Sequence, residues 1–170
     1  MNWKTNKETF LRKEFPDCLE GVKGNPSPLW GKMTFQGMIE HMSESIAMGY
    51  GKYRYPKQVD DIALEKLRSF MLSDKVFRPG TPNSIIGDNP LPLRFNSTSE
   101  AIRDLRSSIE EFFKFYETNP EVETENPFFG MLNKDQWVHL LCKHAWHHLN
   151  QFGIVKDEEY AVYFRDSARS

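Results

Sequence analysis

Apolar side chains recur at three- and four-residue spacing in four separate stretches of the sequence, and this periodicity constrains the fold most. The spacing is that of amphipathic α-helices with one face turned to a core. We predict helices over residues 34–50, 57–72, 99–117 and 133–153. No stretch before residue 154 shows the period of two that a half-buried strand requires. The pattern therefore predicts an all-α fold, a bundle of helices joined by loops.

The ends of two of these helices carry recognisable signals. Thr34 is suited to cap the start of the first helix. Asn133 and Gln136 have the spacing of a capping box at the start of the last one. Gly153 follows its final turn, where glycine commonly ends a helix. These signals place the ends of the predicted helices more firmly than the periodicity alone.

Outside these four helices we expect shorter or irregular segments. A short helix is expected over 5–15, limited by Pro16, and residues 21–31 are expected to form a loop. The segment 76–97 holds four prolines, which forbid a regular helix; it is either a lid over a binding site or a surface excursion. Residues 154–164 are expected to form a short extended piece or a last helical turn.

Composition narrows the class of protein. A length of 170 residues is that of one domain, spanning 1–170. The net charge of −2 is unlike that of general nucleic-acid binders, so no nucleic-acid partner is expected. No stretch is long and apolar enough for a membrane span, and no secretory signal is visible at the start. Two cysteines do not make a disulfide scaffold, so we expect reduced thiols in a cytoplasmic protein.

Four of the five histidines fall within ten residues of one predicted helix. Helical geometry places His144 and His148 one turn apart inside its apolar arc, His147 at the edge of that arc, and His139 on the opposite, solvent-exposed side. Two imidazoles at this spacing can bind one zinc, nickel, iron or copper ion. The alternative is that they are core polar residues bonded to neighbouring helices.

A third ligand is needed for a metal, and His41 flanks the apolar face of the helix 34–50. Three histidines would leave a coordination position open, which is typical of catalytic rather than structural sites. Cys142 lies away from His144 and His148 on the helical wheel, and Cys18 has no assigned place. A metal that only ties helices together remains an alternative.

Two motifs resemble a known family. The first is W-G-x-M-T at residues 30–34 followed by His41, and the second is N-P-F-F-G at 126–130 followed by K-H-x-x-x-H-L-x-Q-F-G at 143–153. Together they are similar to the DinB / YfiT-like superfamily, in particular its DUF1569 branch. The resemblance implies a four-helix bundle with an up-down-down-up path. It also implies a divalent metal, for which we expect zinc or nickel, held by His41, His144 and His148.

Members of that superfamily transfer small thiols, act as thiol-dependent isomerases or are proposed hydrolases. The resemblance therefore implies a metal-dependent transferase or hydrolase whose substrate is a small molecule, such as a low-molecular-weight thiol. A non-catalytic metal- or small-molecule-binding bundle is the alternative. Candidates for groups that support the ligands are Gln151, Glu44 and Ser45, although Glu44 also fits a solvated surface carboxylate.

Three further groups of residues have two interpretations each. Arg78 and Arg94 either hold an anionic group of a substrate or are solvated. Three tryptophans either line the pocket or fill the core: Trp30, Trp137 and Trp146. Three tyrosines are candidate contacts of a homodimer: Tyr50, Tyr53 and Tyr55.

Overall fold

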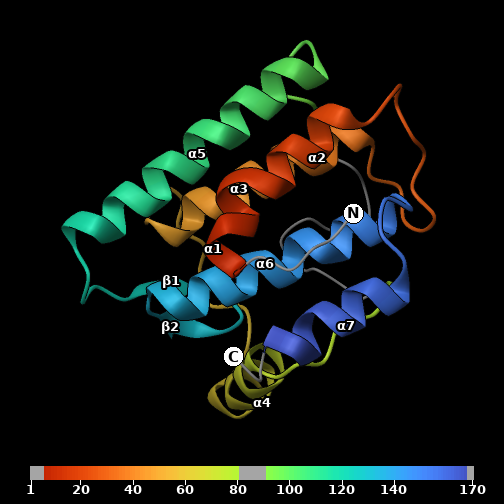
Figure 1. Cartoon of the computed structure of the whole chain (residues 1–170). Helices are drawn as coiled ribbons and strands as arrows, with labels where there is room; N and C mark the ends of the chain where they lie inside the picture. The colour runs from red at the N-terminus through yellow and green to blue at the C-terminus, as the bar shows by residue number, and fades with distance from the viewer. Residues whose placement is uncertain (1–5, 81–90, 168–170) are drawn as a thin grey trace.

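The computed structural model describes residues 6–80 and 91–167 and is mostly helical, with one small two-stranded hairpin. Figure 1 shows α2 (Phe15–Gly21), α3 (Phe35–Gly49) and α5 (Thr98–Thr118) on one side of α6 (Lys134–Gln151). On the other side of α6 lie α4 (Asp61–Leu72) and α7 (Asp157–Ser167). The predicted helical class is thus confirmed, and α6, which carries the histidines, lies between the two groups.

The predicted apolar stripes form the core between these helices. Every apolar stripe residue of α3 is at most 1% exposed: Phe35, Met38, Ile39, Met42 and Ile46. Helix α5 packs against α3 and contributes Leu105, Ile109 and Phe112 to the same core cluster. Gly49 permits this contact, because a Cβ atom there would lie 2.7 Å from the Phe112 ring. The core therefore sets how closely α3 approaches α5, and with it the position of His41.

The helix ends agree with the capping signals. The Thr34 side chain accepts a hydrogen bond from the Gly37 N–H, and α3 begins at the next residue. Asn133 and Gln136 form both bonds of the capping box at the start of α6. Gly153 has a φ of 66°, the left-handed conformation for which glycine is favoured after a helix.

The sequence predicted that Pro16 limits the first helix, and this prediction is wrong. The chain runs through α1 (Lys7–Thr9), the π-helix η1 (Phe10–Glu14) and α2 without leaving the helical conformation. The Phe15 N–H donates to the Phe10 carbonyl, a span of five residues. A proline clashes with the carbonyl four residues before it in a regular helix, and the wider π turn ahead of Pro16 relieves that clash.

The expectation of no strand before residue 154 is wrong. Strands β1 (Thr124–Asn126) and β2 (Gly130–Leu132) pair antiparallel, with Asn126 opposite Gly130. The Asn126 side chain accepts hydrogen bonds from the Phe128 and Phe129 N–H groups, which closes the turn. Two strands of three residues are too short to show an alternating pattern, so periodicity could not reveal them.

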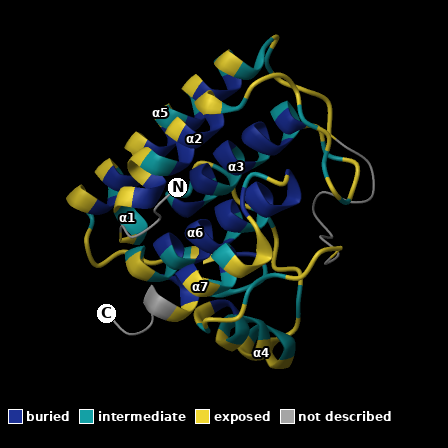
Figure 2. Cartoon of the chain, turned by 45° about the vertical axis from the view of Figure 1, so that its right-hand side comes forward, coloured by how far each residue is buried: buried dark blue, intermediate teal, exposed yellow. Residues whose placement is uncertain are grey.

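The C-terminal segment forms a longer helix than expected. Helix α7 buries three aromatic side chains against α6: Tyr160, Tyr163 and Phe164. Helix α4 starts at Asp61 rather than near residue 57, capped by the Asp60 side chain. Its residues are exposed or half-buried (Figure 2) except Met71, which is buried. Within the described residues, no helix is long and apolar enough to cross a membrane.

Candidate metal centre

Three histidines from two helices converge at one point between α3 and α6. The Nε2 atom of His144 lies 2.9 Å from Nε2 of His41 and 2.9 Å from Nε2 of His148. One ring nitrogen from each of the three lies within 4.8 Å of the others. The structure thus brings together the three residues that the sequence had selected, on the helix faces that periodicity predicted.

Gln151 fixes which nitrogen of His148 faces the cluster. The Gln151 amide nitrogen donates to the Trp30 carbonyl at 2.9 Å, so its amide oxygen is turned to Nδ1 of His148, at 2.7 Å. An amide oxygen only accepts, so Nδ1 of His148 must carry the proton. Its Nε2 atom is then a bare lone pair directed at the other two rings. Gln151 thus makes the hydrogen bond to His148 that a group supporting a ligand would make.

The surroundings keep all three imidazoles neutral. Burial, followed by the nearby His147, lowers the pKa of His41 to about 4. Burial and the neighbouring histidines lower the pKa of His144 and of His148 well below the usual range. Neutral imidazole is the form that binds a metal. The cluster thus holds its ligands ready at neutral pH.

The spacing of these nitrogens suits one metal ion. Separations of 2.9 Å are hydrogen-bond distances between ring nitrogens, and they are also short enough for one ion with metal–nitrogen bonds of about 2.0–2.1 Å to contact two of the nitrogens. Without a shared ion or proton, three neutral rings would direct lone pairs at one another in a buried place. The donor set therefore fits a divalent metal, although its identity does not follow from the ligands.

A cleft of about 110 Å³ opens beside His41. We call it the His41 cleft, and its walls are Met33, Thr34, Gly37, Glu40, His41 and Glu44 from the start of α3 and the preceding turn, with residues 91–94 opposite. Part of the proline-rich segment therefore lies over the candidate site. Residues 81–90 of that segment lie outside the described part of the chain, so the lid interpretation of 76–97 stays a prediction.

Glu40, which sequence reasoning missed, ties that wall to α3. Its buried carboxylate accepts hydrogen bonds from the Arg94 N–H at 2.6 Å and from the Phe95 N–H at 3.3 Å. Gln36 donates to the same carboxylate at 2.9 Å and to the Phe95 carbonyl at 2.8 Å. The position of Glu40 next to a candidate ligand was the one available signal, because Arg94 and Phe95, whose N–H groups it binds, are more than fifty residues away.

Arg94 is already paired, so its proposed role in holding an anion is not supported. Its guanidinium lies 3.6 Å from the Glu40 carboxylate and 3.5 Å from that of Asp104, and it also donates to the Glu40 carbonyl. Arg78 is exposed. Where the segment lines the His41 cleft, at residues 91–94, it thus offers a mainly apolar wall whose one arginine is already paired.

Glu44 and Ser45 lie beside His41 but do not bond to its ring. Glu44 lines the His41 cleft and accepts a hydrogen bond from the Tyr55 hydroxyl, which raises the pKa of Tyr55 to about 12. Ser45 donates to the backbone carbonyl of His41 at 2.9 Å. Of the other tyrosines, Tyr50 donates to Glu111 at 2.7 Å. Tyr50 and Tyr55 thus have partners within the chain.

The remaining histidines lie outside the cluster. His147 is half-buried, with its ring 5.8 Å from Trp30 and 6.1 Å from Phe77, at the edge of the apolar arc as predicted. His139 is half-buried rather than exposed, because α7 places Phe164 against its ring at 5.6 Å. Since α7 was not predicted as a full helix, that cover could not be anticipated.

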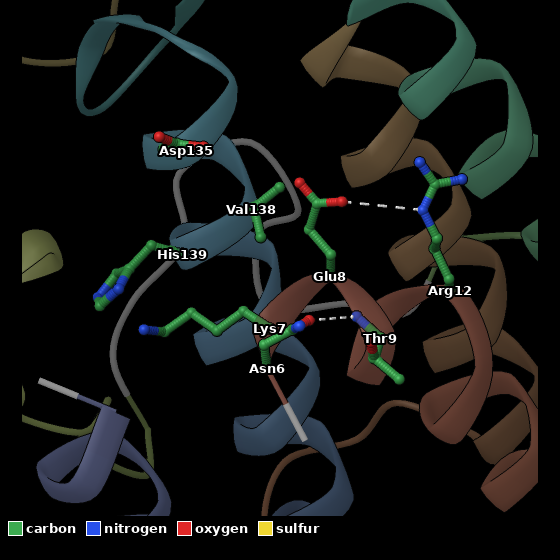
Figure 3. A pocket seen from close by; sticks show the side chains of 8 residues that line it. All are labelled: Asn6, Lys7, Glu8, Thr9, Arg12, Asp135, Val138 and His139. Carbon is green, nitrogen blue, oxygen red and sulfur yellow. Dashed lines mark hydrogen bonds and ion pairs between the residues drawn. The ribbon is translucent and has the colours of Figure 1, made fainter. Parts of the chain in front are cut away.

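His139 lines a second, larger concavity at the other end of α6, of about 580 Å³. Figure 3 shows its walls, with the Lys7 side chain extending from α1 toward His139. None of the three clustered histidines lines it. Cavity volume alone would make this concavity the candidate functional site. The position of the possible metal ligands instead favours the His41 cleft.

The other candidate ligands and aromatic residues fall in the core. Cys142 is fully buried, with its sulfur 3.7 Å from the Tyr163 hydroxyl, and Cys18 is also buried; neither is part of the histidine cluster. Trp137 and Trp146 are at most 1% exposed and fill the core, while Trp30 packs on His147. The geometric argument against Cys142 as a ligand is confirmed.

Lys143 is a second feature that the sequence did not reveal. It is 0% exposed, and its ammonium donates to the carbonyls of Met71 and Ser73, each at 2.7 Å. These groups lie at the C-terminal end of α4, where carbonyls lack partners within the helix. Burial lowers the pKa of Lys143 to about 8. Lys143 thus fixes α4 to α6 from the residue next to His144.

Comparison with known families gives one match. Residues 76–154 match the family described as "Protein of unknown function (DUF1569)". The matched segment includes His144 and His148, and His41 lies before it. No curated protein matches the chain, and no solved structure does. The match agrees with the family resemblance of the sequence motifs, and the family's description assigns no activity.

Proposed function

We propose that His41, His144 and His148 bind one divalent metal ion, zinc or nickel, and that the protein is a metal-dependent enzyme. The observation that carries this proposal is the convergence of three Nε2 atoms, two pairs of them 2.9 Å apart, from two different helices. The neutral state of the rings and the Gln151 bond support it. In the part of the chain whose side chains the structure describes, no other histidine, cysteine or carboxylate joins the three histidines, which leaves room for another molecule at the ion.

The reaction we propose is thiol transfer or hydrolysis on a small molecule. A divalent metal with three neutral nitrogen ligands lowers the pKa of a bound water or thiol and polarises a carbonyl. The chain's part is to hold the substrate in the His41 cleft, which adjoins one ligand and is large enough only for a small group. Residues 91–94 cover the cleft, and Glu40 holds that cover in place.

The same proposal extends to ancestry and architecture. We place the chain in the DinB / YfiT-like superfamily, as a single domain over 1–170 built on an up-down-down-up bundle. The motif at 143–153 and the DUF1569 match support this placement. A homodimer in the cytoplasm, with no nucleic-acid or membrane partner, completes the proposal.

The competing proposal is a bundle that binds a metal or small molecule without turnover. Metal analysis of the purified protein first asks whether an ion is bound at all. Cobalt substitution then distinguishes an open from a closed site, because added thiol or azide changes the visible spectrum only if it reaches the ion. An electrophile such as chlorodinitrobenzene with a small thiol tests transfer, and a nitrophenyl ester tests hydrolysis. Binding without conversion of either would favour the non-catalytic alternative.

A further inference from the structure

The charges that line the His41 cleft are unequally compensated. Arg94 and Glu40 pair with each other, and Arg94 also reaches Asp104. The Glu44 carboxylate has only the Tyr55 hydroxyl, a neutral donor, on one of its oxygens. Among the described residues, no lysine, arginine or histidine forms an ion pair with Glu44. The uncompensated charge of the cleft is therefore negative, and it lies one turn from His41.

The opposite wall of the cleft is apolar and partly exposed. Leu91 is 56% and Leu93 49% exposed, although both line the cleft. Leu93 lies beside Gly37 of α3, where a Cβ atom would be in ordinary van der Waals contact with the Leu93 Cδ2 atom at 3.6 Å. Exposed leucines beside a concave site are typical of a surface that binds a ligand. The cleft thus offers an apolar wall, a carboxylate and a candidate metal ligand.

We propose that Glu44 selects substrates bearing a positively charged nitrogen: small amines whose apolar part lies on Leu91 and Leu93. The proposal rests on the open metal site proposed above, which would receive a second group of the same molecule. A small aminothiol has this chemistry, with an ammonium for Glu44 and a sulfur for the metal. A volume of about 110 Å³ limits the bound part to a few atoms.

The test compares three thiols on the cobalt-substituted protein and on two variants. Cysteamine carries an ammonium, 2-mercaptoethanol is neutral, and 3-mercaptopropionate is anionic. Glu44→Gln keeps an acceptor for Tyr55 but removes the charge. Glu111→Gln is the matched control, because Glu111 also accepts from a tyrosine hydroxyl, that of Tyr50, but lies on α5 outside the cleft. Each thiol is compared with itself across the proteins, so differences in thiol acidity cancel.

We expect Glu44→Gln to weaken cysteamine binding about tenfold, as loss of a charge-assisted hydrogen bond does. Binding of 2-mercaptoethanol should change less than about twofold, mercaptopropionate should bind more tightly, and Glu111→Gln should alter none of the three. Equal weakening of all three thiols by Glu44→Gln, or no change in any, would overturn the proposal.

A second measurement keeps this result separate from the metal proposal. If cobalt does not bind, or no thiol alters its spectrum, the open metal site is refuted. Titration of the purified protein with propylammonium, followed by amide NMR, then decides the role of Glu44. Shifts at Gly37 and Glu44 that Glu44→Gln abolishes, and that propionate does not produce, support amine selection. Equal shifts with both ions, or none with propylammonium, contradict it.

Discussion

At the scale of single residues, two histidines of α6 differ in their contacts with the cluster. His144 contacts both other rings, whereas His139 lies 5.6 Å from Phe164 and away from the cluster. We expect His144→Ala to lose most of its bound metal, because two ligands rarely hold an ion that three can bind. His139→Ala should retain the wild-type metal content. Elemental analysis of both purified variants decides, and equal loss in the two would contradict the assignment.

Substitutions of Gln151 test whether its hydrogen bond to Nδ1 of His148 orients that candidate ligand. Gln151→Ala removes the acceptor that directs Nδ1–H of His148, so we expect metal affinity to fall about 10- to 100-fold. Gln151→Glu keeps an acceptor for His148 but loses the donor to the Trp30 carbonyl. Competition with a chelator should therefore rank affinity as wild type, then the glutamate variant, then the alanine variant. An alanine variant with wild-type affinity would show that the bond does not orient the ring.

At the scale of elements, Lys143 explains how the exposed helix α4 stays in place. Lys143→Met leaves the Met71 and Ser73 carbonyls without their charged partner. We expect the free energy of unfolding, measured by urea denaturation, to fall by about 2 kcal/mol. Hydrogen exchange should rise most in the last turn of α4.

The matched control for this change is Lys66→Met, at an exposed position of α4 itself. Its effect should stay within about 0.5 kcal/mol, as is usual for surface substitutions. If both variants lose the same stability, the ammonium of Lys143 has no special role at the end of α4.

The same elements show what could be predicted from sequence and what could not. Thr34, Asn133 and Gln136 act on backbone groups a few residues away, so their spacing predicted the starts of α3 and α6. The histidine pair was predictable because its spacing is a property of one helix. The backbone groups that bond to Glu40 and Lys143 lie 54 to 73 residues distant, and no local pattern reports such contacts.

At the scale of the whole molecule, the candidate site joins two parts of a core that is complete without it. Figure 2 shows buried residues along α3, α5 and α6, and the buried apolar side chains of these helices belong to one core cluster. His41 on α3 and His144 on α6 lie at the rim of that core and are partly exposed. A bound ion would therefore connect helices that already pack through their apolar stripes.

We therefore expect the metal-free protein to remain folded. Treatment with EDTA should leave the far-UV circular dichroism spectrum helical and lower the melting temperature by about 5–10 °C, relative to protein with metal at a hundredfold excess over its dissociation constant. Burial of the stripes, rather than the ion, supplies the larger share of stability. His144→Ala provides the control, because a variant without the ion should melt at the same temperature with and without EDTA. Loss of the helical signal in wild type on chelation would instead mean that the ion holds α3 and α6 together, and an open catalytic site would then be the wrong interpretation of the three histidines.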